Sequence, residues 1–418
     1  MSTHPQVNWA GNHTYAAQRL NRPRSVEELR DVVGGTEHVR ALGSRHSFSD
    51  LADTEGTLVS LLDLPADIEV DAEASSVRVS AGVTYGALAT ALHREGWALA
   101  SMASLPHITV AGAVATGTHG SGDALGSLSS AVRAVELVGP DGELRRVAVG
   151  DATFEGHVVA LGALGVVTHL TLEVEPAFEV RQDVLVGLGW DDLQQHLDAI
   201  MGSTYSVSVF TDWVDAAANQ VWLKSRSMTP PDVTGVLGGT SPATETTHML
   251  RGGALESLTA QLGEVGPWHE RLPHFRMGFT PSRGAELQSE YFVPRRHASA
   301  ASTALLELGE RLAPLLQVSE IRSVAADQLW LSGSYDEDVV GFHFTWVLDP
   351  EGVYDVLPSV EEALAPFGAR PHWGKCFTMR APALHAVHPR MGDFARLRDE
   401  VDPGRKFGNA FMQRCLGS

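Results

Sequence analysis

Hydrophobic and polar positions recur with two different periods in the first part of the chain, and each period predicts a different kind of element. Residues 25–33 (SVEELRDVV) begin with a serine, continue with two glutamates and place apolar residues at helical spacing, which is typical of a capped amphipathic helix. Residues 68–96 predict a strand, a turn, an alternating strand, and a helix that starts after Thr84 and ends near Gly96. Residues 132–149 predict a hairpin, because two alternating strands flank a Pro-Asp-Gly turn.

The pattern changes near Pro176. After it, strands such as 341–348 (GFHFTWVL) alternate with helices such as 301–316 (ASTALLELGERLAPLL), and loops of small residues disappear. Residues 397–413 predict a helix end and a turn that could return to the first part of the chain. We therefore expect an α+β protein with these parts: residues 1–176, residues 177–374, and a returning segment 375–418.

Composition and charge argue against several classes of protein. A chain of 418 residues with 44% hydrophobic residues can bury a large core. Lys and Arg number 31 against 51 Asp and Glu, a net charge of −20, which argues against nucleic acid as a partner. The two cysteines, Cys376 and Cys415, are too few for a disulfide framework or a cysteine-rich metal site. Because no signal-like segment and no run of about 18 apolar residues occurs, we expect a cytoplasmic protein without a membrane span.

Three stretches of small residues could bring backbone N–H groups close to an anion. They are the loop around His46 (RALGSRHSFSD), residues 101–130, and the glycine-punctuated turn at 161–167. None fits a GxGxxG or P-loop pattern, so each alone is better explained as a tight turn, but the occurrence of three together favours an anion-binding role. His46 is accordingly either a structural cap or the point where a ligand is held.

Three predicted strands place polar residues on one face. The pairs are Glu320 with Arg322, His343 with Thr345, and Gln288 with Glu290. In the second strand the opposite face is aromatic, so if that face is core, the polar face meets either solvent or a ligand. A carboxylate, guanidinium, imidazole, hydroxyl and amide together suit a molecule with several hydroxyls, such as a polyol. They suit zinc less well, since His343 has no neighbouring ligand at helical or strand spacing, and we predict no metal site.

Several of these stretches, taken together, resemble a known family. The motifs GSRHS, MASLPHITVAGAVATGTHGSG, ALGALGVVT and DPGRKFGNAF resemble the FAD-binding domain of the vanillyl-alcohol oxidase family, and more narrowly the bacterial alditol oxidases. The similarity continues through GPWHERLPHFR, AELQSEY, EIRSVAAD, HFTWV and RPHWGK, so it covers nearly the whole chain. The resemblance implies a two-domain α+β fold: an FAD-binding domain completed by the C-terminal tail, and an α/β cap domain that covers the isoalloxazine ring.

The resemblance also implies how the cofactor is held. In this family the histidine of the GSxHS loop carries FAD covalently, and His46 matches it. Residues 101–130 contain no cysteine, so we expect a single link; Arg45 stands where this group would have glycine. The residues expected at the cofactor are Leu42, Gly43, Ser44, Arg45, His46, Ser47, Ser101, Ser104, His107, Val110, Gly112, Ala115, Thr116, Gly117, Thr118, His119, Gly120, Gly165, Val166, Val167, His372 and Asn409.

The implied reaction is oxidation of the terminal CH2OH of a polyol such as xylitol or sorbitol to the aldose, with hydride transfer to flavin N5 and reduction of O2 to H2O2. An alkoxide-like oxygen needs cations, and Arg322 and Lys375 match the family's substrate site. Lys375 lies between apolar residues, where desolvation would lower its pKa and let it accept the proton; alone, it could equally be a snorkelling lysine. Glu320 is expected to bind hydroxyls and hold Arg322. The remaining substrate contacts are expected from Ser104, Gln288, His343 and Thr345.

Other readings of the sequence stay open. A flavin-dependent sugar or sugar-lactone dehydrogenase would pass electrons to a quinone or cytochrome instead of O2. A sugar-binding protein without catalysis would use the glycine loops only as structure. A zinc hydrolase is disfavoured, because the 18 histidines show no HExxH-like spacing. The resemblance further suggests a monomer.

Overall fold

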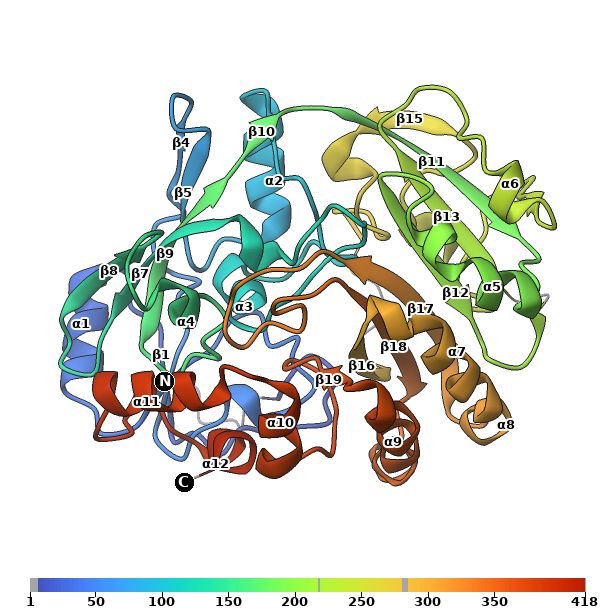
Figure 1. The fold of residues 1–418 in the computed structure, drawn as a ribbon. Helices are drawn as coiled ribbons and strands as arrows, with labels where there is room; N and C mark the ends of the chain where they lie inside the picture. Colours follow the sequence, from blue (N-terminus) through green and yellow to red (C-terminus); the bar gives the residue numbers. More distant parts are fainter. Residues whose placement is uncertain (1–6, 217–218, 280–284, 418) are drawn as a thin grey trace.

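The computed structural model describes residues 7–216, 219–279 and 285–417, and Figure 1 shows them as two halves side by side. The chain passes from one half to the other along the top of the view through two consecutive strands, β10 (Glu175–Pro176) and β11 (Glu179–Val186). The C-terminal helices lie beneath the first half. Within the described ranges, no helix is both long and apolar enough to cross a lipid bilayer.

The first half contains three sheets, one of them only two-stranded, and four helices among its described residues. A parallel sheet has the order β1 (Arg19–Asn21), β3 (Thr57–Val59), β2 (Val39–Ala41). An antiparallel sheet has the order β4 (Ile68–Asp71), β5 (Ser76–Ser80), β9 (Val166–Glu173), β7 (Val132–Val138), β8 (Leu144–Ala148). The helices are α1 (Val26–Gly34), α2 (Tyr85–Arg94), α3 (Val110–Ala115) and α4 (Phe154–Val158), and β6 (Trp97–Ala98) pairs with β10.

The predicted elements of this half are confirmed. Helix α1 is capped by Ser25, whose hydroxyl accepts a hydrogen bond from the Glu28 N–H at 3.2 Å. Thr84 caps α2 in the same way, and the chain leaves that helix through Gly96, whose φ of 81° suits glycine. Strands β7 and β8 form the predicted hairpin, with Val135 opposite Val147.

The second half is built on one large antiparallel sheet. Its order over the described residues is β14-β11-β13-β12-β17-β18-β16-β19, with β15 also paired to β11. The strands are β12 (Ser206–Thr211), β13 (Gln220–Ser225), β14 (Ser241–Pro242), β15 (Glu264–Pro267), β16 (Glu286–Pro294), β17 (Leu316–Val324), β18 (Val339–Val347) and β19 (Arg370–Pro371). The helices are α5 (Trp190–Met201), α6 (Thr234–Leu237), α7 (Ala298–Glu307), α8 (Gly309–Leu312) and α9 (Pro350–Leu364).

One face of this sheet is covered by helices and carries the apolar core. Phe342, Phe344 and Trp346 of β18 are fully buried in a cluster that also contains Leu197 of α5 and Leu357 of α9. Burying three aromatic side chains in this way fixes the register of the strand, since a one-residue slip would turn them to the other face. The predicted aromatic face of residues 341–347 is confirmed.

The helix predicted over 301–316 is wrong in its extent. The structure divides this segment into α7 and α8, with a break at Leu308, and the helical backbone ends at Leu312. A side chain at Gly309 would lie 2.0 Å from the carbonyl oxygen of Trp213, so the glycine lets a neighbouring loop approach the helix backbone. This contact depends on tertiary packing and leaves no trace in the local sequence pattern.

The C-terminal segment contacts the first half. It contains α10 (Ala381–Val387), α11 (Met391–Val401) and α12 (Ala410–Leu416). Phe394 and Phe411 are buried in the same cluster as Phe154 of α4 and Leu51. Short 3-10 turns complete the described chain: η1 (Asp50–Ala52), η2 (Leu128–Ala131), η4 (Leu255–Ser257), η5 (Trp268–Glu270), η6 (Arg295–His297) and η7 (Ala365–Phe367).

Candidate active site

A cavity of about 590 Å3 is lined by residues of both halves. On one side are the loop after β2, the loop and helix at 103–119, and the turn before β9; on the other are side chains of β16, β17 and β18. This volume falls within the range typical of ligand and cofactor sites.

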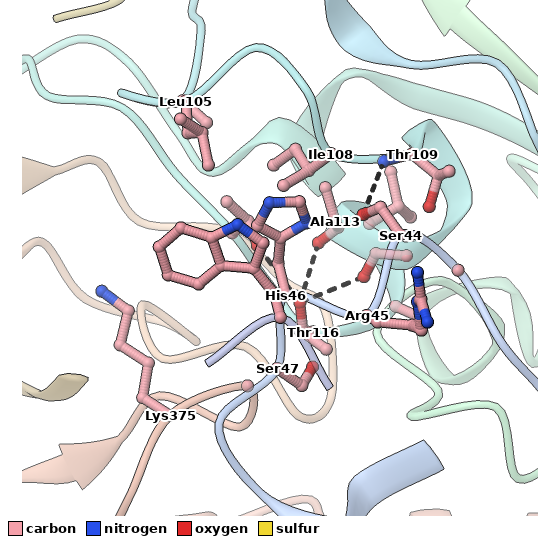
Figure 2. A pocket seen from close by; sticks show the side chains of 18 of the residues that line it. Ser44, Arg45, His46, Ser47, Leu105, Ile108, Thr109, Ala113, Thr116 and Lys375 are labelled. Carbon is pink, nitrogen blue, oxygen red and sulfur yellow. Dashed lines mark hydrogen bonds between the residues drawn. The ribbon is translucent and has the colours of Figure 1, made fainter. Parts of the chain in front are cut away.

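His46 lies in the loop that follows β2, and its ring stacks on Trp9 with centroids 5.3 Å apart (Figure 2). Burial and the neighbouring His107 lower the pKa of His46 to about 4, so its imidazole is neutral at neutral pH. Its Nδ1 is buried and has no hydrogen-bond partner among the described residues. A neutral imidazole nitrogen with a free lone pair is a competent nucleophile.

The backbone conformation explains how arginine can stand at residue 45, where glycine would be expected. Arg45 has a φ of 64°, the left-handed region that favours glycine. Its side chain is exposed, and Nη1 donates to the carbonyl oxygen of Val7 at 3.4 Å. The loop therefore keeps a glycine-like backbone although its residue is arginine.

Two glycines bring the His46 loop against the segment that leads into α3. A Cβ atom at Gly43 would lie 2.7 Å from the Thr109 hydroxyl oxygen, and a Cβ at Gly112 would lie 2.8 Å from the same atom. Ser44 joins the two segments directly, because its hydroxyl accepts a hydrogen bond from the Thr109 N–H at 3.3 Å (Figure 2). The small residues thus form a close-packed wall of the cavity.

Most of the residues expected at the cofactor line this cavity. They are Leu42, Gly43, Ser44, Arg45, His46, Ser47, Ser104, Gly112, Ala115, Thr116, Thr118, His119, Gly165, Val167 and His372. The others lie outside its lining: Ser101, His107, Val110, Gly117, Gly120, Val166 and Asn409.

Several residues outside the lining have contacts of their own. Ser101 and Gly120 border a separate small cavity. His107 lies with Nε2 2.9 Å from the carbonyl oxygen of Met277. Asn409 caps α12, and its amide also donates to the carbonyl oxygen of Asp53 at 2.9 Å, which ties the C-terminal helix to the first half. The cofactor roles of these residues stay predictions.

The residues expected at the substrate all line the cavity, and the sheet register explains why. Gln288 of β16 lies opposite Thr345 of β18, and His343 lies opposite both Glu290 of β16 and Glu320 of β17. Directly opposed residues point to the same face of a sheet. The three predicted polar faces therefore form one continuous polar surface, which also includes Ser104 and Lys375 from neighbouring loops.

Glu290 is the centre of this surface, and it is a residue to which the sequence analysis gave no role. It is buried, and its Oε1 accepts from Arg322 Nη2 at 2.8 Å, while its Oε2 lies 2.6 Å from Lys375 Nζ. Burial alone would raise the pKa of Glu290, but Lys375 and Arg322 outweigh it and hold that pKa well below its usual range. The sequence signal that could have assigned Glu290 to the site was its position two residues from Gln288, on the same face of the predicted strand.

Arg322 forms the expected buried ion pair with Glu320, whose Oε2 lies 3.6 Å from Arg322 Nε. Glu290 makes a second and shorter contact that was not expected. Residues two apart on one strand share a face, but a residue on a neighbouring strand can lie closer to the end of a long side chain. Among the described residues, Ser104 also contacts this arginine, with its Oγ 3.5 Å from Nη1.

Lys375 is buried as expected, and burial lowers its pKa while the Glu290 carboxylate opposes that change. Burial and the positive charge of Lys375 lower the pKa of His343 well below its usual value, so His343 is neutral. Its Nε2 lies 3.1 Å from Gln288 Oε1. Neutral His343 can exchange hydrogen bonds with hydroxyl groups in either direction.

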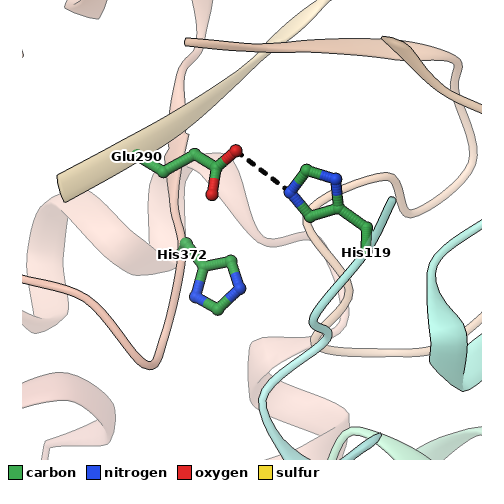
Figure 3. Close-up of side chains that lie close together, drawn as sticks. All are labelled: His119, Glu290 and His372. Carbon is green, nitrogen blue, oxygen red and sulfur yellow. Dashed lines mark ion pairs between the residues drawn. The ribbon is translucent and has the colours of Figure 1, made fainter. Parts of the chain in front are cut away.

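His119, Glu290 and His372 also lie close enough to be weighed as metal ligands (Figure 3). Their ligand atoms are within 4.8 Å of one another, and His119 Nε2 is 3.1 Å from Glu290 Oε1. Both oxygens of Glu290 already face the cations Arg322 and Lys375, which would repel a divalent ion. The cluster is better suited to holding the carboxylate than to binding a metal.

Comparison with known proteins was made by sequence and by structure. A model of the FAD binding domain matches residues 17–148, and a model of D-arabinono-1,4-lactone oxidase matches residues 279–415. An alditol oxidase from Streptomyces sp. is 50% identical over 98% of each chain. An L-gulono-1,4-lactone dehydrogenase from Mycobacterium tuberculosis is 28% identical over 98% of each chain.

A solved structure supports the fold. The crystal structure of cholesterol oxidase from B. sterolicum superimposes with a TM-score of 0.79 at 14% identity, covering 99% of this chain and 96% of that one. The predicted fold class, an α+β FAD-binding fold of the vanillyl-alcohol oxidase type with a second, cap-like part, is confirmed. With half of its residues identical to those of a full-length relative, the chain belongs to the alditol oxidase family of FAD-binding enzymes.

Proposed function

We propose that the protein is an FAD-dependent alditol oxidase, which oxidises the terminal CH2OH of a polyol such as xylitol or sorbitol to the aldose and reduces O2 to H2O2. The observation that carries this proposal is the polar surface of two cations and several hydrogen-bonding groups in the same cavity as His46. The 50% identity to an alditol oxidase supports it.

The cavity fits FAD in its volume, its close-packed wall of small residues, and the partnerless buried Nδ1 of His46. His46 would carry the cofactor covalently, with Ser44, Gly43 and Gly112 leaving room for its approach. When bound, flavin supplies the hydride acceptor at N5. The separation into an FAD-binding part (1–176), a cap part (177–374) and a returning tail (375–418) belongs to this proposal, as do a monomeric state and a cytoplasmic location.

Side chains of the polar surface would accept the proton of the reacting hydroxyl and stabilise the negative charge that develops on its oxygen. Arg322 and Lys375 would bind the oxygen of the reacting hydroxyl and stabilise the negative charge that develops there. Lys375, whose pKa burial lowers, would take the hydroxyl proton in its neutral form. Ser104, which contacts Arg322, would lie near the reacting carbon.

The other groups would bind the hydroxyls that do not react. Glu320 accepts hydrogen bonds, and His343, Gln288 and Thr345 can both donate and accept. Because these residues lie along adjacent strands, they can meet successive hydroxyls of an extended polyol.

The second candidate is a dehydrogenase that passes electrons to another acceptor, which the 28% identical lactone dehydrogenase favours. The distinguishing experiment measures H2O2 released per xylitol or sorbitol consumed in air. One H2O2 per aldose supports the oxidase, whereas turnover only with an added dye or quinone supports the dehydrogenase. A colourless protein that oxidises neither xylitol nor sorbitol would instead support a sugar-binding protein without catalysis.

The covalent link has its own test. The acid-precipitated and washed wild-type protein should be yellow, and the pellet of His46→Ala should be colourless. A yellow pellet from His46→Ala, or a colourless wild-type pellet above a yellow supernatant, would refute the link at His46.

A further inference from the structure

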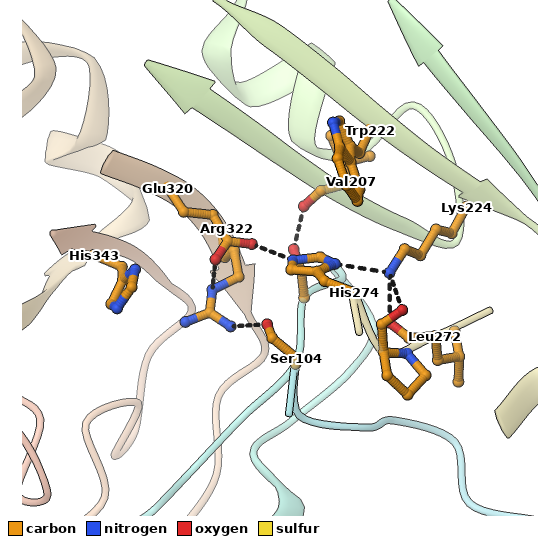
Figure 4. A network of polar contacts seen from close by, with 12 residues as sticks. Ser104, Val207, Trp222, Lys224, Leu272, His274, Glu320, Arg322 and His343 are labelled. Atoms are coloured by element: carbon orange, nitrogen blue, oxygen red, sulfur yellow. Dashed lines mark hydrogen bonds and ion pairs between the residues drawn. The ribbon is translucent and has the colours of Figure 1, made fainter. Parts of the chain in front are cut away.

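Behind Glu320 lies a buried pair of titratable residues for which the reaction has so far required no role (Figure 4). His274 lies between Glu320 and Lys224, with its Nε2 2.7 Å from Glu320 Oε1 and its Nδ1 3.1 Å from Lys224 Nζ. All three residues are at most 5% exposed. Glu320 and His274 line the main cavity, while Lys224 borders only the separate small cavity behind them.

Lys224 is held without a carboxylate among its hydrogen-bond partners in the described part of the chain. Its Nζ contacts the carbonyl oxygens of Leu272 and Pro273 and the Nδ1 of His274. These are three acceptors for the three N–H groups of an ammonium. The geometry therefore matches a protonated lysine donating to Nδ1.

The contacts with Lys224 and Glu320 require the same tautomer of the histidine. Burial and Lys224 lower the pKa of His274 to about 4, so its imidazole is neutral and carries one N–H. An ammonium can only donate and a carboxylate can only accept, hence Nδ1 accepts from Lys224 and the hydrogen lies on Nε2. That N–H donates to Oε1 of Glu320, and among the described residues Oε2 then has only the long 3.6 Å contact to Arg322.

We propose that Lys224 and His274 are positioning residues for Glu320: the lysine donates to Nδ1 and holds the imidazole ring in place, and the Nε2–H fixes the carboxylate so that its other oxygen accepts a substrate hydroxyl. The proposal rests on the proposed function, since it requires that Glu320 binds a polyol. Neither residue touches the substrate, and both act through Glu320.

The proposal has a pH dependence with a definite sign. Burial, the largest effect, lowers the pKa of Lys224 to about 7, against the opposing influence of Glu320. The charged groups that face Lys224 and His274 in the described structure are Glu320, Arg322 and each other. As the pH rises through about 7, the ammonium is lost, the hydrogen bond to Nδ1 weakens, the His274 ring is held less firmly against Glu320, and the KM for polyol should rise.

The variants separate this role from a merely structural one. Glutamine has one donor and one acceptor end and no tautomers, so His274→Gln can replace the fixed histidine, while His274→Phe removes both bonds. Lys224→Met removes the ammonium. Lys406→Met is the matched control, because Lys406 also donates to a backbone carbonyl oxygen, that of Val33, away from the cavity.

The first readout is steady-state oxidation of xylitol by the holoenzyme between pH 5.5 and 9, on variants with wild-type flavin content and circular dichroism. His274→Phe should raise KM by about 10- to 100-fold with a smaller change in kcat, because a bond to a charged group in substrate binding is lost. His274→Gln should stay within about threefold of wild type, and Lys224→Met should show a raised KM that no longer depends on pH near 7. An unchanged KM in His274→Phe would overturn the proposal.

The second readout needs no substrate. In 15N-histidine-labelled protein, the His274 signals, identified by their loss in His274→Gln, should show the Nε2–H tautomer in wild type, Lys406→Met and Lys224→Met, and the signal of the unprotonated Nδ1 should shift in Lys224→Met alone, because it loses the hydrogen bond from the lysine. An Nδ1–H tautomer in the wild type, or an unshifted Nδ1 signal in Lys224→Met, would overturn the inference alone. Absence of polyol oxidation by the wild type would instead overturn the proposed function.

Discussion

Glu290→Gln tests whether one buried carboxylate holds the two cations of the active site. The substitution keeps the size of the side chain and removes its charge. At an effective dielectric constant of about 20, unit charges at the 2.6 Å of the Lys375 contact attract by roughly 6 kcal/mol, and the Arg322 contact at 2.8 Å is similar. Much of this attraction offsets the free-energy cost of removing the charged groups from water.

Removing the Glu290 charge leaves Lys375 without its ion-pair partner and leaves Arg322 with the longer 3.6 Å contact to Glu320, and breaking a buried ion pair in this way costs about 3–5 kcal/mol. We therefore expect the free energy of unfolding of Glu290→Gln to fall by about 3–5 kcal/mol, measured by denaturant unfolding of the holoenzyme followed by tryptophan fluorescence. Glu286→Gln is the matched control on the same strand. Glu286 is also largely buried, but its contact is Gln288 Nε2, and burial raises its pKa.

The difference in the free energy of unfolding between wild type and Glu290→Gln should change with pH in one direction. Because the pKa of Glu290 is held below its ordinary value in the folded protein, its stabilising contribution is fully present above about pH 4.3 and is lost as the pH falls toward the lowered value. The gap between wild type and Glu290→Gln should thus be constant near neutral pH and shrink in acid. An equal, small loss in Glu290→Gln and Glu286→Gln would refute the account of the buried cluster.

Three further predictions concern single residues. Lys375→Met should retain the bound flavin but slow its anaerobic reduction by xylitol, and an unchanged reduction rate would remove Lys375 from the mechanism. His343→Asn should raise KM for xylitol by about tenfold with little effect on kcat, because it contacts a hydroxyl that does not react; a pure loss of kcat would contradict this. Arg45→Gly should leave the free energy of unfolding within about 1 kcal/mol of wild type, and Arg45→Val should lower it by about 1–2 kcal/mol, since φ is 64° there; equal effects would show that backbone conformation is not limiting.

Features that depend on local periodicity could be predicted from the sequence. The capped helix α1, the β7–β8 hairpin and the polar face shared by Glu320 and Arg322 follow from spacings of a few residues. The small residues, and then the family resemblance, indicate the wall of the cavity around His46. These features need no knowledge of which distant segments meet.

Features created by pairing of distant segments could not be predicted in the same way. Glu290 approaches Arg322 only because β16 and β17 both pair with β18. Lys224 reaches His274 because a central strand lies beside an irregular segment about fifty positions away in the chain. The break after α7 follows from the approach of the Trp213 backbone to Gly309. Each is a tertiary contact, which the local pattern does not encode.

The central claim is that this cavity oxidises polyols with a bound flavin, and anaerobic titration with xylitol tests it most directly. The account predicts that the yellow absorbance of the purified holoenzyme bleaches as xylitol is converted to the aldose, and returns on admission of air with one H2O2 per flavin. A flavin that stays oxidised with both xylitol and sorbitol would contradict the account.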